Sequence, residues 1–314
     1  MDIGIVLVTF NRLKDLKKAL ACYDKQSYSP SYVLVVDNCS TDGTYEYLED
    51  WLRHENDHFQ KIVKHLDSNK GGAGGFYAGM NKSLGLRADW IWLADDDAFP
   101  REDALERLNS FYEKQSSANK SSIAALCTAN YNQGKPHLDH RSTLKLTSFR
   151  YHFVKSTRDD YERECFRVDV FSYVGVVIKK KVLQQVGLDD AGFFIYCDDQ
   201  DHSLRVRKAG NIYCVPKSIV DHDKPPYAPN TVNWGKYYRR RNELLMLKRN
   251  FPKRYFYIRF IRGYIGECSF ISRLPKELKI MLRAAYKDAW KGKEGIHSVY
   301  KPGWKITKTV KRGN

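Results

Sequence analysis

The sequence NKGGAGGF at residues 69–76, followed by WIWLADDD at residues 90–97, decides the fold class of this chain. The apolar run 90–94 is typical of a buried strand, and three consecutive carboxylates, Asp95, Asp96 and Asp97, end it. Acids at the carboxyl end of a strand lie where an open α/β sheet binds ligands. Glycines let a backbone approach a bulky ligand, and a hard divalent cation relieves the repulsion between neighbouring carboxylates. These residues together predict a site for a metal and a phosphorylated ligand.

A simpler interpretation exists for each motif alone. The glycines would form a surface loop, and the aspartates would cap a helix that begins near Pro100. The apolar strand directly before the acids, with Pro100 shortly after them, instead favours a strand–acid–helix junction.

The N-terminal residues predict a parallel sheet. Residues 3–10 form a nearly continuous apolar run, as expected for a strand buried on both faces, and helical spacing follows from Leu13. A second strand at residues 32–37 ends on an acid and enters a turn at residues 38–43. Strand, helix and strand at this spacing make a right-handed βαβ unit. Neither a Gly-x-Gly-x-x-Gly sequence nor a P-loop follows the first strand, which argues against an NAD site and against a P-loop NTPase.

Three segments carry a family resemblance: VTFNR at residues 8–12, VDNCSTDG at residues 36–43, and residues 69–97. They resemble family 2 glycosyltransferases, which are inverting enzymes of the GT-A fold that use nucleotide-sugar donors. The doubled glycines with the triple acid are most similar to the galactofuranosyltransferase branch. The resemblance covers about residues 2–225 and implies an α/β fold with a Rossmann-like, mostly parallel sheet flanked by helices.

A second acidic cluster lies in the segment FFIYCDDQDHSLR at residues 193–205, which predicts a short strand entering a helix. Helix N-capping would explain one of the acids Asp198, Asp199 and Asp201, but hardly all three. In the resembling family the second acid of such a pair is the general base, which here is Asp199. We expect the helix N-terminus to hold this carboxylate as the anion, ready to accept a proton near neutral pH.

The resemblance also implies a metal site and a mechanism. A lone histidine is more often structural than a ligand, but the family places a metal-binding histidine at the position of His222. Mn²⁺ or Mg²⁺ held by Asp95, Asp97 and His222 would neutralise the charge that builds on the β-phosphate of the leaving nucleotide. Asp199 would deprotonate the acceptor hydroxyl on the opposite face of the sugar, which inverts the anomeric centre.

The remaining site predictions concern the two substrates. Asp37 would accept a hydrogen bond from the uracil or ribose, and the donor would also contact Thr9, Asn11, Arg12, Asn69, Gly71, Gly72, Gly74, Gly75 and Asp96. A strand at residues 168–178 would run beneath the acceptor, which would contact Phe171, Tyr173, Asp198 and Trp234. UDP-galactofuranose is the preferred donor and dTDP-rhamnose the alternative, with a glycan or lipid-linked acceptor. A non-catalytic sugar-binding protein and a nucleotidyltransferase are the alternatives from other classes.

Charge divides the chain unevenly. The net charge is +16, yet residues 234–314 hold 22 Lys and Arg against 5 Asp and Glu. We expect a catalytic domain at residues 1–225, with a donor half at 1–115 and an acceptor half at 116–225, and a basic helical region at 226–314. Residues 236–250 look helical and amphipathic, with basic and aromatic faces that suit an anionic membrane surface. Solvated helix faces are the alternative, and no motif supports nucleic-acid binding.

The sequence also predicts a location. It shows no signal peptide and no apolar run long enough to span a bilayer. Seven cysteines without Cys-x-x-Cys spacing indicate reduced thiols in the cytosol. The expected location is therefore cytoplasmic and peripheral at the inner face of the membrane. Residues 116–160 are the least patterned and predict loops with an edge strand at residues 124–127.

Overall fold

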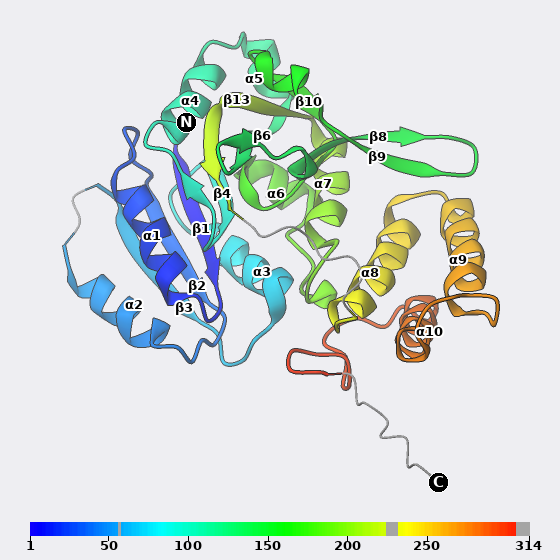
Figure 1. The fold of residues 1–314 in the computed structure, drawn as a ribbon. Helices are drawn as coiled ribbons and strands as arrows, with labels where there is room; N and C mark the ends of the chain where they lie inside the picture. Colours follow the sequence, from blue (N-terminus) through cyan, green and yellow to red (C-terminus); the bar gives the residue numbers. More distant parts are fainter. Residues whose placement is uncertain (56–57, 224–231, 306–314) are drawn as a thin grey trace.

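The computed structural model describes residues 1–55, 58–223 and 232–305. An α/β body built around one large sheet is followed by a group of C-terminal helices (Figure 1). The predicted α/β class with a mostly parallel sheet is confirmed. The predicted domain boundary at residues 225–226 lies outside the described residues.

The predicted parallel strands form one half of the large sheet. In space the order is β3 (Gln60–His65), β2 (Tyr32–Asp37), β1 (Ile3–Thr9) and β4 (Trp90–Asp95), with all neighbours parallel. Every residue of β1 and β2 is buried, which explains their continuous apolar sequences. The carboxyl ends of these strands therefore meet at one edge.

The other half of the sheet is mixed. After β4 come β12 (Val174–Lys179), β6 (Ile123–Asn132), β13 (Asn211–Asp221) and β10 (Phe166–Val168). The prediction of an edge strand at residues 124–127 was wrong, because β6 lies between β12 and β13 and its first eight residues are buried. The short strands β5 (Phe99–Pro100) and β7 (Lys135–Pro136) pair with β13 and β6.

Helices cover both faces of the sheet. One face packs against α1 (Leu13–Asp24), α2 (Thr44–Arg53) and α4 (Ala104–Glu113), and the other against α3 (Gly71–Ser83), α6 (Lys180–Val186) and α7 (Asp198–Ala209). The helix after the acids begins at Ala104 rather than near Pro100, because Pro100 pairs with Val220 of β13. Short helical segments complete the body: α5 (Ser117–Ser122), η1 (Leu138–His140), η2 (Asp159–Glu162) and η3 (Ala191–Phe193).

A three-stranded sheet projects from the body. Its order is β11 (Val170–Phe171), β8 (Arg141–Leu146) and β9 (Tyr151–Lys155), and its hairpin reaches toward the C-terminal helices in Figure 1. The single strand predicted at residues 168–178 was wrong. Val168 pairs with β13 whereas Val170 pairs with β8, so the chain steps from one sheet to the other before it enters β12.

The C-terminal helices are α8 (Gly235–Asn250), α9 (Lys253–Cys268) and α10 (Lys276–Lys291), and they share a core with Leu204 of α7 and with Phe193 and Phe194 before it. The prediction of an exposed basic and aromatic face on α8 was wrong for the aromatic residues, whereas Arg239, Lys248 and Arg249 are exposed. Tyr237, Tyr238 and Arg241 are buried, because α7, α9 and α10 all pack on this helix. In the part of the chain that the structure describes, no helix has the length and apolar character needed to cross a membrane.

Candidate active site at the carboxyl ends of the strands

The triple acid lies beside the end of β1. Asp95 is the last residue of β4 and is in register with Val8, which places Asp96 next to Thr9. The Thr9 hydroxyl donates to Asp96 Oδ2 at 2.7 Å. Arg12 Nη1 donates to Asp96 Oδ1 at 3.1 Å and to Asp97 Oδ2 at 2.7 Å. Thr9 and Arg12, predicted to contact the base and phosphate, thus hold the acidic turn in place.

Asp96 is the buried member of the three acids. Burial raises the pKa of its carboxyl to about 7, and the charges of Asp95 and Asp97 add to this rise. Arg12 and the Thr9 hydroxyl act in the opposite direction, but they only offset part of the shift. Asp96 therefore supports the turn from inside, whereas Asp95 and Asp97 are more open to a ligand.

This pKa predicts how stability depends on pH. Lowering the pH from about 7.5 to about 5.5 is expected to raise the free energy of unfolding by about 2 kcal/mol through Asp96. The folded carboxyl takes up a proton over this range, while the unfolded one, with a pKa of about 3.9, stays ionised. Stability therefore falls as the pH rises. Urea unfolding of the wild type and Asp96→Asn without divalent cations would test this, and a pH-independent difference between the two proteins would contradict it.

His222 lies directly after β13 and meets the triple acid. Its backbone N–H donates to the Tyr131 carbonyl at 2.8 Å, and only 1% of the residue is exposed. Nε2 lies 3.3 Å from Asp97 Oδ1, yet neither ring nitrogen makes a hydrogen bond within the described part of the chain. A buried imidazole without such a bond, facing a carboxylate, fits a metal ligand, and carboxylate oxygens suit Mn²⁺ or Mg²⁺.

The structure brings together two of the three predicted metal ligands. Asp97 and His222 are neighbours, but the described residues contain no group of three His, Cys, Asp or Glu side chains arranged to hold an ion. Asp95 lines the cavity beside them. The assignment of these residues to a metal stays a prediction.

A cavity of about 310 Å³ opens next to the acids, and many of the predicted donor residues line it. The predicted residues that line it are Thr9, Arg12, Asn69, Gly71, Gly72, Asp95, Asp96 and Trp234. Six further residues were not predicted: Val8, Phe10, Asn38, Phe194, Ile195 and Pro302. Trp234, predicted to bind the acceptor, thus lies with the donor residues.

The glycine-rich segment forms the first turns of α3 rather than a loop. Gly71 has a φ of +74°, and a side chain there would overlap the Phe194 carbonyl. A Cβ on Gly75 would lie 2.5 Å from Val8 Cγ1, and one on Gly74 would overlap the Lys70 side chain. Gly74 and Gly75 allow close packing and do not line the cavity, so their donor contacts stay predictions. Gly72 has open space beside it and lines the cavity.

Two predicted donor residues act within neighbouring turns. The Asn11 backbone N–H donates to Ser40 Oγ at 3.0 Å, and its side-chain oxygen accepts from the Thr41 backbone at 2.7 Å. Asp37 is buried, accepts from the Ser40 N–H at 2.9 Å and lies 2.9 Å from His65 Nδ1. Neither residue lines the cavity, and their contacts with a nucleotide stay predictions.

Asn38 is a residue that the sequence did not single out. It is buried next to Asp37, and its Nδ2 donates to the Gly71 carbonyl at 2.8 Å. Its Oδ1 accepts from the Lys70 backbone N–H at 2.8 Å. Asn38 therefore fixes the start of α3 to the end of β2. An asparagine directly after a strand that ends on an acid was the available signal.

The second acidic cluster begins α7 as predicted. Asp199 Oδ1 accepts from the Gln200 N–H at 2.7 Å, and the carboxylate lines a cavity of about 250 Å³ together with Phe171 and His140. Burial raises the pKa of Asp199 to about 6, and the nearby charge of Asp95 also raises it. The hydrogen bond from the Gln200 N–H at the helix N-terminus lowers this pKa, but burial outweighs it. The raised pKa makes Asp199 a stronger base that is still ionised near neutral pH.

The neighbouring acid is more deeply buried. Burial raises the pKa of Asp198 well above its ordinary value, and the charge of Asp199 adds to this rise. Asp198 is buried and is therefore poorly placed for the predicted acceptor contact, which stays untested.

The predicted aromatic acceptor contacts have different surroundings. Tyr173 is only 3% exposed; its hydroxyl lies 2.7 Å from His202 Nδ1 and its ring centroid 4.4 Å from that of Phe76. It is a core residue, so its predicted stacking on a sugar was wrong. Phe171 is also buried but lines the Asp199 cavity, and its role stays a prediction.

The segment before α7 has an unusual backbone. The short strand predicted before the helix is not formed. Positive φ values, which a strand does not contain, occur at Phe194 (64°), Tyr196 (67°) and Cys197 (65°). Such values are uncommon for residues with side chains and persist only where the surroundings enforce them. Asn242 Nδ2 supplies that constraint, because it donates to the carbonyls of Phe193, Ile195 and Tyr196 at 2.9, 2.8 and 2.9 Å.

The neighbouring residue on α8 adds to this constraint. Arg241 Nη2 donates to the Gly192 and Phe193 carbonyls at 3.2 and 3.1 Å, and its Nη1 donates to the Gly295 carbonyl at 2.6 Å. Both side chains are buried. The sequence signal was a charged and an amide residue within the apolar spacing of a predicted helix.

Asn242→Ala is expected to lower kcat by about 10- to 100-fold, because the turn that places Asp199 loses its support. Three carbonyls would lose a donor, so the free energy of unfolding should also fall by about 1–3 kcal/mol. Asn250→Ala on the same helix is the control, since Asn250 contacts Asp201 and not this turn. Kinetics at a temperature where both variants are folded would decide; wild-type kcat in Asn242→Ala would show that Asn242 acts only on stability.

The sequence is similar to known glycosyltransferases. A sequence model described as glycosyl transferase family 2 matches residues 4–186. The galactofuranosyltransferase GlfT1 of Mycobacterium tuberculosis is 27% identical over 215 residues, which cover 65% of this chain and 64% of that protein. The abequosyltransferase RfbV of Salmonella typhimurium is 27% identical over 188 residues, which cover 58% of this chain and 53% of that protein. The chain thus spans less than two thirds of the length of these curated relatives.

The fold also has solved counterparts. The crystal structure of GalNAc-T7 with UDP, GalNAc and Mn²⁺ superimposes with a TM-score of 0.63 at 16% identity, covering 93% of this chain and 56% of that chain. Identity at this level shows the fold alone. The expected GT-A fold is confirmed by this likeness.

Proposed function

Because the chain belongs to glycosyl transferase family 2, we propose that it transfers a sugar from a nucleotide-sugar to an acceptor hydroxyl with inversion. One observation carries the proposal. Asp95 lines the cavity beside the triple acid, Asp199 lines the other cavity, and the charge of Asp95 raises the pKa of Asp199, which indicates that the two acids are near each other. A donor in the first cavity and an acceptor in the second would therefore meet between these two acids.

Residues of this chain would perform the proton transfer and the positioning. Asp199 would accept the proton of the attacking hydroxyl, and the Asn242 contacts would hold its turn during the reaction. Arg12 would fix Asp96 and Asp97. At the start of α3, Gly72 leaves room for the donor, and the N-terminus of this helix favours the negative charge of its phosphates.

A divalent cation fits the residues near Asp97. We assign Asp97 and His222 as ligands for Mn²⁺ or Mg²⁺, with Asp95 completing the set, because a buried imidazole and a carboxylate oxygen face each other at 3.3 Å. The related fold with UDP and Mn²⁺ in its crystal structure supports this choice. When bound, the cation would neutralise the charge that develops on the leaving diphosphate.

UDP-galactofuranose is the proposed donor. The support is the similarity to a galactofuranosyltransferase together with the glycine and triple-acid motifs. The similarity to an abequosyltransferase shows that relatives are named for other sugars, so dTDP-rhamnose stays the second candidate. We propose a glycan or lipid-linked acceptor in cell-surface polysaccharide synthesis, at the cytoplasmic face of the membrane.

A donor panel tests the proposal. The protein would be incubated with a series of UDP-, GDP- and dTDP-sugars in the presence of Mn²⁺, and both turnover and the shift in melting temperature would be measured for each. Turnover of UDP-galactofuranose above the others is expected. Protection by a nucleotide-sugar without any turnover, with acceptors supplied, would favour a non-catalytic sugar-binding protein. Diphosphate release from a nucleoside triphosphate and a sugar phosphate would favour a nucleotidyltransferase.

A further inference from the structure

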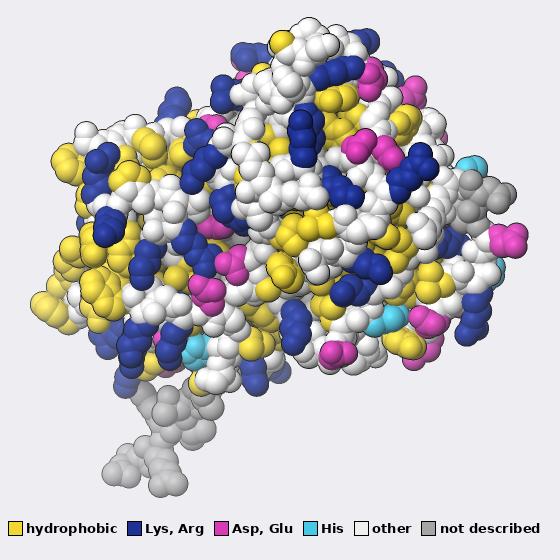
Figure 2. All heavy atoms as spheres, turned by 180° about the vertical axis from the view of Figure 1, so that it is seen from behind, with side chains coloured by type: hydrophobic (Ala, Val, Ile, Leu, Met, Phe, Trp, Pro, Cys, Tyr) yellow, Lys and Arg dark blue, Asp and Glu magenta, His cyan; other side chains and the backbone are white. Residues whose placement is uncertain are grey.

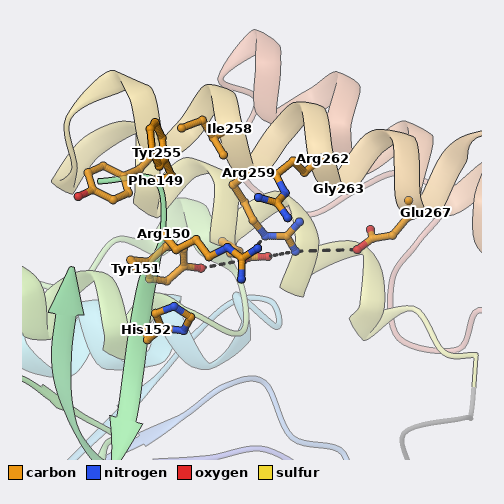
Figure 3. A pocket seen from close by; sticks show the side chains of 12 residues that line it. Phe149, Arg150, Tyr151, His152, Tyr255, Ile258, Arg259, Arg262, Gly263 and Glu267 are labelled. Atoms are coloured by element: carbon orange, nitrogen blue, oxygen red, sulfur yellow. Dashed lines mark hydrogen bonds and ion pairs between the residues drawn. The ribbon is translucent and has the colours of Figure 1, made fainter. Parts of the chain in front are cut away.

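A second large hollow lies away from the active-site cavities. It has a volume of about 570 Å³ and lies between the tip of the β8–β9 hairpin and helix α9 (Figure 3). The hairpin contributes residues 149–152, and α9 contributes residues 255–267. We call it the hairpin groove.

The charges at the base of the hairpin groove are balanced. Glu243 accepts from the Tyr151 hydroxyl at 2.7 Å and from Arg259 Nε at 2.7 Å. Arg240 pairs with both Glu243 and Glu267. Two arginines therefore neutralise two glutamates, and this network holds the hairpin against α8 and α9.

Two further arginines are left over. Arg150 on the hairpin and Arg262 on α9 extend into the groove from its two walls (Figure 3). Among the residues that the structure describes, neither has a carboxylate within ion-pair distance, and the side chain of neither makes a hydrogen bond. The groove thus has an excess of two positive charges on guanidinium groups, which bind phosphate through paired N–H donors.

Apolar side chains are exposed on the hairpin, on α9 and just after α9; we call them the apolar rim, and of those named here Phe149 lines the groove itself. Phe149 at the hairpin tip is 66% exposed, Ile261 on α9 is 56% exposed, and Phe270 just after α9 is 94% exposed. Leu146 and Ile265 are also exposed. Figure 2 shows hydrophobic side chains gathered among Lys and Arg at the edge formed by the C-terminal helices. Exposed apolar patches of this kind mark surfaces that bind a partner or a membrane.

We propose that the hairpin groove binds the phosphate of an anionic membrane lipid, while the apolar rim inserts between headgroups. Free phosphate would neutralise the two arginines but would leave the apolar rim in water. An anionic lipid would neutralise the arginines and also remove the apolar rim from water. Strand β9 also supplies Phe153 and Lys155 to the Asp199 cavity, so docking here would bring the acceptor side toward the lipid surface. The inference rests on the proposed membrane location. It assigns the docking face to the hairpin and α9 instead of α8.

Vesicle co-sedimentation tests the groove. The full chain would be mixed with phosphatidylcholine vesicles with and without phosphatidylglycerol. Arg150→Gln/Arg262→Gln is expected to raise the lipid concentration for half-binding by about 30-fold, as two basic contacts are lost. The control Arg53→Gln/Arg158→Gln removes the same charge from exposed positions outside the groove and should change binding by less than about threefold. Phe149→Ser/Ile261→Ser should also weaken binding, without altering the charge.

The outcomes separate the explanations. If both arginine double variants lost vesicle binding equally, the attraction would be unspecific and the proposal would be refuted. A wild type that does not bind anionic vesicles at low salt would also refute it. A third outcome is that millimolar inorganic phosphate raises the melting temperature of the wild type while the protein does not bind vesicles. This would assign the groove to free phosphate and refute the proposal that it binds a lipid. Donor hydrolysis without vesicles is measured in parallel: vesicle binding without hydrolysis would refute the proposed transfer and leave the groove assignment standing.

Discussion

Asp199→Asn is expected to reduce kcat by about three orders of magnitude while donor and metal binding stay close to wild type. Asparagine keeps the shape of the side chain and can still accept from the Gln200 N–H, but it cannot take the proton of the acceptor hydroxyl. A general base contributes about 100- to 10,000-fold to a rate. Initial rates with saturating donor, together with the donor-induced shift in melting temperature, would measure the two effects separately.

Asp201→Asn is the matched control on the same turn of α7. Asp201 is paired with Arg205 at 3.1 Å and bonded to Asn250, so it serves the fold. Its substitution should change kcat by less than about tenfold. If Asp199→Asn changed only the donor KM, Asp199 would be a binding residue, and its assignment as the general base would be refuted.

Asp97→Ala is expected to abolish measurable transfer, a loss of at least about 1,000-fold, and to remove the response of the rate to added Mn²⁺. The change removes the carboxylate that faces His222 at 3.3 Å. The protein should stay folded, because Asp97 is partly exposed and its loss also relieves the repulsion from Asp95 and Asp96. Transfer assays over a Mn²⁺ titration, with circular dichroism as the folding check, would measure both effects.

Asp103→Ala serves as the control for Asp97→Ala. Asp103 is a half-buried acid that pairs with Arg107 on α4 and lines neither the donor cavity nor the Asp199 cavity. It should transfer at the wild-type rate with the wild-type response to Mn²⁺. An Asp97→Ala enzyme that kept most of its activity would refute the assignment of Asp97 to the metal.

The sequence predicted the parts of the fold that local patterns determine. Strands β1, β2 and β4 are apolar runs that end on polar residues, and the βαβ spacing set their parallel order. The position of β6 in the middle of the sheet depends on its pairing with β12 and β13, which are far away in the sequence. A surface loop was the simpler alternative for the glycines of α3, whereas in the structure they begin a helix in which Gly75 packs close to Val8.

The sequence also predicted some residues of the candidate site and missed others. The acids were singled out because they follow a strand or begin a helix, where side chains of that chemistry are exposed to a ligand, whereas His222 was assigned from the family resemblance. Tyr173 was misassigned because alternation along a strand does not reveal which side faces the core. Asn38 and Asn242 were missed because each acts on a backbone carbonyl brought close only by folding.

The support of the Asp199 turn by α8 has a consequence for synthesis of the protein. The strands and the triple acid leave the ribosome early, whereas Asn242 is made 45 to 49 residues after the turn at residues 193–197 that it holds. Arg241 additionally needs Gly295, which comes later still. Trp234 and Pro302, which line the donor cavity, are also made late, so catalytic competence would arrive only when the C-terminal helices have been translated and packed.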